Sequence, residues 1–167
     1  MTRNNRPILP IERSPLELFL EIIAFLGVLA GIIIIAKYWP VLPDIIPVHF
    51  GITGKPDSWG NKSIILIFPL LALIMDVGYI ILSNYPHTFN YPVRITPENA
   101  AKQYKLARDL LLWMKIEMIW MFAFIDWQIV QVSLGNMPKL SAELLFIILA
   151  VIFGTTGFYF WKAYRSQ

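Results

Sequence analysis

The sequence predicts an all-α polytopic membrane protein with four transmembrane helices. Hydrophobic residues make up 57% of the 167 residues and charged residues only 15%, whereas soluble domains average about 25% charged residues. Four apolar runs, at about 16–39, 64–83, 110–134 and 142–161, are each long enough to cross a hydrocarbon core of about 30 Å. A segment rich in proline and glycine, 38–63, separates the first two runs, and we expect an ordered loop there.

The first apolar run follows a polar tail, residues 1–15, that carries Arg3, Arg6 and Arg13. The tail resembles the charged flank of a signal sequence. However, the run at 16–39 is longer than a signal-peptide core and has no small-residue cleavage site after it. We therefore predict an uncleaved first transmembrane helix.

Two features of the first two runs bear on helix packing. Gly27 and Gly31 form a small-xxx-small pair, which is typical of close helix packing, although glycine is also common in membrane helices generally. The second run, 64–83, contains Pro69, which we expect to kink the helix, and the ionisable residue Asp76.

A polar segment at 84–109 leads into the third run. Thr96-Pro97-Glu98 supplies a capping residue, a proline suited to the first helical position and an acidic first turn. We expect a helix to begin there and to continue through 110–134.

Basic residues are divided unequally between the two sides of the predicted bundle. Four crossings place both termini on one side, with nine Lys and Arg there, four on the other side and Lys115 within a run. The nine are Arg3, Arg6, Arg13, Arg94, Lys102, Lys105, Arg108, Lys162 and Arg165, and the four are Lys37, Lys55, Lys62 and Lys139. The excess predicts that both termini, 84–109 and 162–167 lie in the cytoplasm and that 38–63 lies outside.

The 38–63 segment has four prolines, which exclude a helix, and an extended apolar stretch at 45–50. A segment this hydrophobic should fold back on the bundle, and its simplest role is a rigid cap over the helix ends. A second interpretation gives His49, with Asp44 and Asp57, a role in metal binding, pH sensing or proton transfer. The Asp-x4-His spacing is not specific for a metal, so we predict no metal site and a histidine held by one carboxylate.

The third run, 110–134, is the most polar, and with Asp76 it supplies the ionisable groups of the predicted membrane core. They are Asp76, Lys115, Glu117 and Asp126. Such groups normally face partners or water inside the membrane. Counting residues from the ends of the runs places Asp76 and Lys115 at similar heights, which predicts an ion pair between the second and third helices. The alternatives are that Lys115 and Asp126 snorkel to an interface, or that the ionisable groups form an ion or proton path.

The loop also carries a long pattern, Tyr38-x-x-x-Leu42-Pro43-Asp44-x-Ile46-Pro47-x-His49-Phe50-x-x-x-Gly54-x-Pro56-Asp57-x-Trp59-x-x-Lys62. This pattern resembles the signature of a bacterial membrane domain of unknown function that also forms the N-terminal part of the SdpI family. The archetype of that family is the immunity protein against the sporulation-delaying toxin, which also signals to a cytoplasmic repressor and has additional helices. The resemblance implies that Pro43, Asp44, Pro47, His49, Phe50, Gly54, Asp57, Trp59 and Lys62 form a binding or structural motif.

These observations favour a small integral membrane protein that acts through interaction, in toxin immunity, sensing or regulation at the cell surface. Its expected partners are the lipid bilayer, a peptide toxin or membrane protein, and a second copy of itself. The alternatives are an oligomeric ion- or proton-coupled transport module that uses the intramembrane charges, and an intramembrane hydrolase that uses His49. With no cysteine and no GxSxG, HExxH or Walker pattern, we expect no enzyme, catalytic residue, cofactor or metal. No basic stripe suggests a nucleic-acid partner.

Overall fold

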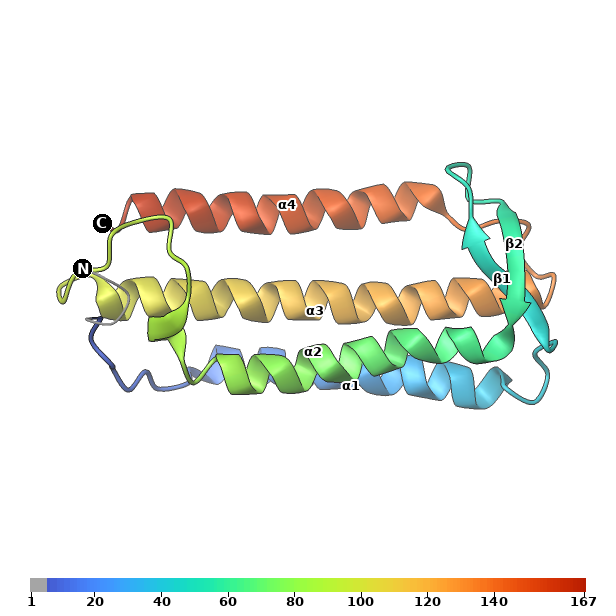
Figure 1. The fold of residues 1–167 in the computed structure, drawn as a ribbon, viewed down its shortest axis with the longest axis horizontal. Helices are drawn as coiled ribbons and strands as arrows, with labels where there is room; N and C mark the ends of the chain where they lie inside the picture. The colour runs from blue at the N-terminus through green and yellow to red at the C-terminus, as the bar shows by residue number, and fades with distance from the viewer. Residues whose placement is uncertain (1–5) are drawn as a thin grey trace.

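The computed structural model is a bundle of long helices with a small sheet across one end (Figure 1). It describes residues 6–167. Residues 1–5, which include Arg3, and the side chains of residues 142, 144 and 145 lie outside the described part. The helices are α1 (Pro15–Tyr38), α2 (Ile67–Leu82), α3 (Ala100–Ser133) and α4 (Ala142–Tyr164), with short 3-10 helices η2 (Lys62–Leu66) and η3 (Pro86–Thr88). The segment that precedes α1 in the described part and the C-terminus lie at the end of the bundle opposite the sheet (Figure 1).

The all-α prediction is wrong for one segment. Instead of the expected ordered loop, 38–63 contains an antiparallel hairpin of β1 (Ile45–Phe50) and β2 (Pro56–Asn61). A two-stranded sheet has two edges, so prolines are tolerated in it. Gly54 has a φ of +78°, and this left-handed conformation closes the connection between the strands. The prolines therefore excluded a helix correctly, and the glycine marked a turn of a hairpin.

Among the residues that the structure describes, three helical segments are long and apolar enough to cross a membrane, namely 15–38, 62–82 and 146–164. They correspond to the first, second and fourth predicted crossings. The third predicted crossing, 110–134, lies within α3, which is longer and more polar. That crossing stays a prediction.

The central element of the bundle is α3, which packs against α1, α2 and α4 (Figure 1). A core of apolar side chains joins α3 to α1 and α2, and it consists of Leu20, Ala24, Val28, Ala72, Tyr79, Leu112, Ile116, Ile119 and Phe122. The fourth helix shares only a small cluster with α3, formed by Ala107, Tyr159 and Ala163. Most of the apolar surface of α4 therefore stays exposed, as expected of a helix that faces lipid.

The glycine pair of α1 does permit close helix packing. A Cβ at Gly27 would lie 2.8 Å from Ile119 Cγ2 and 3.1 Å from Trp120 Nε1, and one at Gly31 would lie 3.8 Å from the Cα of Ala123. A larger residue at Gly27 would therefore displace the side chains of Ile119 and Trp120. The predicted role of the pair is confirmed for the contact between α1 and α3.

Two predicted helix features are shifted. Pro69 lies in the first turn of α2, directly after η2, where helix N–H groups lack intrahelical partners. It therefore marks the change from η2 to α2 and does not bend a continuous helix. The third helix begins at Ala100, one turn later than predicted. Thr96 and Asn99 still form reciprocal capping bonds: the Asn99 N–H donates to Thr96 Oγ1 at 3.3 Å, and the Thr96 N–H donates to Asn99 Oδ1 at 2.9 Å.

Candidate functional site

The hairpin is anchored to the end of the bundle by buried apolar side chains. Leu42, Ile46 and Ile65 pack with Ile129 and Val130 of α3 in a single cluster. Burial of this cluster holds β1 against the helices, because fully burying each branched side chain contributes about 1.5–3 kcal/mol. The hairpin therefore folds back on the bundle as the sequence predicted.

Polar groups of the hairpin mainly bind one another. His49 Nδ1 lies 2.5 Å from Asp57 Oδ1 across the two strands, and the His49 side chain is 70% exposed. Asp44 lies elsewhere and pairs with Lys62, whose Nζ is 3.1 Å from Asp44 Oδ1 and 3.3 Å from the Leu42 carbonyl. The histidine is thus held by one carboxylate, as predicted. Among the described residues, no group of three potential metal ligands includes it.

The remaining motif residues divide between the anchor and the outer surface. Pro47 and Gly54 are buried, and Phe50 packs on the anchoring cluster, whereas Pro43 is exposed. Trp59 is also exposed, and other large apolar side chains accompany it on the hairpin, with the highest exposure, 89%, at Ile52. These are Ile45, Val48, Ile52 and Trp59. We call this set the exposed apolar residues of the hairpin.

A pocket of about 240 Å³ lies where the hairpin connection meets α3 and the start of α4. The Gly54 carbonyl accepts a hydrogen bond of 2.8 Å from the Leu140 N–H, which joins the hairpin to the segment before α4. The lining is mostly apolar, and its most buried polar member is Gln128. Gln128 Oε1 accepts a 2.6 Å bond from the Ser141 N–H. Sequence reasoning missed this pocket, because it depends on chain segments far apart in the sequence.

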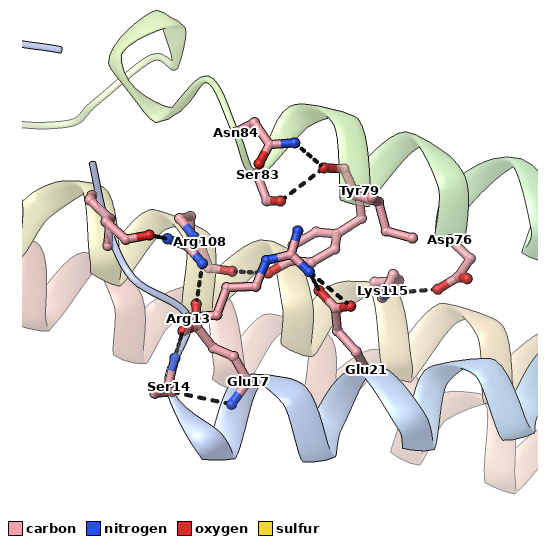
Figure 2. Close-up of polar contacts among 12 residues, drawn as sticks. Arg13, Ser14, Glu17, Glu21, Asp76, Tyr79, Ser83, Asn84, Arg108 and Lys115 are labelled. Atoms are coloured by element: carbon pink, nitrogen blue, oxygen red, sulfur yellow. Dashed lines mark hydrogen bonds and ion pairs between the residues drawn. The ribbon is translucent and has the colours of Figure 1, made fainter. Parts of the chain in front are cut away.

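A second group of polar side chains occupies the bundle near the opposite end (Figure 2). Lys115 Nζ lies 2.7 Å from Asp76 Oδ1, and both side chains are almost fully buried. The same ammonium lies 4.5 Å from the centre of the Tyr79 ring, a favourable cation–π position. The predicted ion pair between the second and third helices is therefore present, and the snorkelling alternative for Lys115 is wrong.

The sequence reasoning missed an equally buried ion pair, Glu17 with Arg108, in which Arg108 Nη2 lies 2.9 Å from Glu17 Oε1. Glu17 also accepts from the Ser14 N–H at 2.6 Å and completes a capping box at the start of α1. The Tyr79 hydroxyl donates to the Arg108 carbonyl at 3.3 Å, which links this pair to Asp76 and Lys115 (Figure 2). The Ser-x-x-Glu pattern, combined with the similar heights of Glu17 and Arg108 near the ends of their runs, could have revealed the pair.

The N-terminal tail closes this end of the bundle. Arg6 Nη1 donates to the Phe89 carbonyl at 2.6 Å, and the guanidinium lies 5.3 Å from the centre of the Tyr91 ring. The Tyr91 hydroxyl donates to the Pro86 carbonyl at 2.8 Å. Burial raises the pKa of Tyr91 well above its usual value, so the phenol keeps the proton that it donates. The tail is therefore tied to the segment between α2 and α3.

Glu117 and Asp126, the other two ionisable residues of the predicted membrane core, have different environments. Glu117 Oε1 accepts a 2.6 Å bond from the Thr155 hydroxyl and links α3 to α4. Asp126 is fully buried at the contact of α3 with Gly31, and neither carboxyl oxygen has a hydrogen-bond partner among the described residues. Its burial contradicts the snorkelling alternative for Asp126. The four ionisable residues of the predicted membrane core thus do not converge on one site.

Comparison with known proteins identifies the hairpin region. A family described as a domain of unknown function (DUF1648) matches residues 26–73, from the second half of α1 through the hairpin into α2. An uncharacterized protein of Archaeoglobus fulgidus is 30% identical over 59 residues, which cover 30% of this chain and 32% of the archaeal protein. The chain therefore matches only about a third of that relative's length. No solved structure matches. The region shared with this family of unknown function is the one that carries the hairpin and its anchoring cluster.

Proposed function

We propose that the chain is a non-enzymatic, multi-pass membrane protein that binds a partner through the exposed apolar residues of its hairpin. The proposed role is toxin immunity, sensing or regulation at the cell surface. One observation carries this proposal: the hairpin is fixed to the bundle, yet it exposes Ile45, Val48, Ile52 and Trp59. Exposed apolar patches on an ordered element are typical of binding surfaces. The resemblance of the motif to the SdpI family supports the same kind of role.

The orientation is also part of the proposal. We place α1, α2, α3 and α4 across a bacterial plasma membrane, with both termini in the cytoplasm and the hairpin outside. Pairing of the charges on α3 supports its crossing, because charged groups inside a membrane must face partners. Single-cysteine variants at Ser58 and at Lys102 test the topology. We expect an impermeant thiol reagent to label Ser58→Cys in intact cells and Lys102→Cys only after lysis, and the reverse pattern would refute the orientation.

Photo-crosslinking tests the binding role. A photoreactive amino acid at Ile52 should give a discrete adduct in native membranes, identified by mass spectrometry, whereas the same probe at Phe153 of α4, which is 74% exposed, should label only lipid. Trp59→Ser should abolish the adduct at Ile52 without altering the melting temperature, because Trp59 lies on the surface. The binding role fails if Ile52 and Phe153 give the same adducts.

A second candidate is ion- or proton-coupled transport by an oligomer, and the lone buried carboxyl of Asp126 is the observation that favours it. Against it, Asp76 and Lys115 are engaged with each other, and the pockets at the two ends of the bundle are lined by other residues. Proteoliposomes give a direct test. Transport would be supported if the parent protein conducts ions or protons and if Asp126→Asn and the double variant Asp76→Asn/Lys115→Met abolish this flux while they stay folded. If the parent protein shows no flux, the transport candidate is refuted.

A further inference from the structure

The pocket beside the hairpin combines an apolar interior with one unused hydrogen-bond donor. Its apolar walls include Phe50, Phe124 and Phe146, which come from β1, α3 and α4. Gln128 lines the same pocket, is only 3% exposed, and uses its amide oxygen for the Ser141 N–H. No hydrogen bond joins its amide nitrogen to another described residue, and this nitrogen is not among the fully buried polar atoms without a partner. The nitrogen is therefore open to the pocket as a donor, and the pocket suits an apolar ligand that carries an acceptor.

Two lysines are the sequence neighbours of residues that line the pocket. Lys55 follows Gly54 and Lys139 precedes Leu140, and the hydrogen bond between Gly54 and Leu140 brings these two chain segments together. Both lysines are exposed. Lys139 Nζ has only a long contact, 3.9 Å, with Glu143 Oε1, and no described carboxylate pairs with Lys55. The two ammonium groups can therefore attract an anion at the surface.

We infer that this pocket binds an anionic phospholipid from the leaflet on the hairpin side. An acyl chain enters between Phe124 and Phe146, a glycerol ester carbonyl accepts from the Gln128 amide nitrogen, and the phosphate lies near Lys55 and Lys139. The pocket, at about 240 Å³, exceeds the apolar cavity of about 150 Å³ that admits benzene, so it can hold several methylene groups. Gln128 is five residues from the end of α3, or about 7–8 Å along its axis. This depth is close to the level where lipid esters meet the hydrocarbon.

Native mass spectrometry of the full-length protein, titrated in detergent with phosphatidylglycerol or phosphatidylcholine of identical acyl chains, tests this site. We expect one phosphatidylglycerol to bind tightly. Lys55→Gln/Lys139→Gln should weaken it about 20-fold and abolish the preference over phosphatidylcholine, because each lysine near a phosphate contributes about fivefold. Gln128→Met should weaken both lipids about fivefold through loss of one hydrogen bond. The matched control, Lys102→Gln/Lys105→Gln at the opposite end, should change the affinity less than twofold.

A phosphatidylglycerol with a photoactivatable acyl chain locates the site. We expect adducts on the peptides that contain Phe124 and Phe146. Gln128→Met also removes the bond to Ser141, so this variant can fail to fold. In that case the lysine double variant decides the outcome, because it changes only exposed groups. Equal binding of the two lipids, an unchanged affinity of Lys55→Gln/Lys139→Gln, or adducts spread evenly over α1 and α4 would overturn the inference. So would a peptide or a second copy of the chain found in this pocket without lipid.

Discussion

The buried pair of Asp76 and Lys115 gives the sharpest stability prediction. Lys115→Met removes the ammonium but keeps an unbranched apolar chain of similar length, so it leaves the Asp76 carboxylate buried without its partner. At the observed 2.7 Å, and with an effective dielectric constant of 20, the lost attraction is about 6 kcal/mol. Part of this attraction offsets desolvation of the two charges. We therefore expect a net loss of about 3–5 kcal/mol in the free energy of unfolding.

Removing both charges should restore most of this stability. In Asp76→Leu/Lys115→Met, no charge remains to be desolvated, and apolar replacement of a buried pair is often neutral or stabilising. We expect the double variant to unfold within about 1 kcal/mol of the parent protein. The coupling energy from the complete cycle should then be at least 2 kcal/mol.

Reversible unfolding with sodium dodecyl sulfate in mixed micelles, followed by circular dichroism, measures all four proteins of the cycle. The matched control is Lys105→Met, because Lys105 pairs with Asp109 at 3.0 Å on the same helix but at the surface. Its expected cost is about 0.3–0.5 kcal/mol. The reasoning is refuted if Lys115→Met costs no more than Lys105→Met, or if the effects of changing Asp76 and Lys115 are additive.

Three further substitutions test other contacts. Gly27→Ala should destabilise the protein by about 1–3 kcal/mol, because the new methyl group would lie 2.8 Å from Ile119 Cγ2, whereas Gly154→Ala meets open space and should cost nothing; thermal unfolding compares the two. Glu17→Gln should cost about 3–5 kcal/mol, since it leaves a buried guanidinium without its carboxylate, and a cost below 1 kcal/mol in the same assay would show that the pair is not desolvated. Gly54→Ala should release the hairpin from the start of α4, because its φ of +78° disfavours alanine and the new Cβ would collide with the Leu140 carbonyl. Hydrogen exchange at the Leu140 N–H should then rise at least tenfold, and unchanged exchange would contradict this reasoning.

The sequence predicted those features that depend on one helix or on heights along two helices. The apolar runs correspond closely to α1, α2 and α4, and counting residues from the ends of two runs was sufficient to pair Asp76 with Lys115. The same reasoning could have paired Glu17 with Arg108. However, a carboxylate such as Glu17 in the first turn of a helix already has a local explanation, because it suits the helix N-terminus, and it therefore does not point to a partner on another helix.

Features that depend on packing between distant segments could not be predicted from the sequence. The hairpin has only six residues in each strand, and its prolines weaken the usual strand pattern. Nothing in the spacing of Gln128 within the third run indicates that the segment before α4 folds over it. The environment of Asp126 also depends on the close approach of Gly31 and Ala123. The spacing of the glycines alone could not establish this approach, because glycine is common in membrane helices.

The two ion pairs on α3 have a consequence for the hairpin at the other end. Arg108 and Lys115 are seven residues apart and so lie on one face of α3, where Arg108 pairs with α1 and Lys115 with α2. Together they fix the axial positions of both helices that the hairpin connects. A hairpin held between two fixed ends loses less conformational entropy when a partner binds. We therefore expect Lys115→Met, under conditions in which it stays folded, to raise hydrogen exchange in β1 and β2 while that of Lys105→Met stays at the parent level. If exchange in the hairpin is the same in both variants, the anchoring cluster alone fixes it and the ion pairs serve only the opposite end of the bundle.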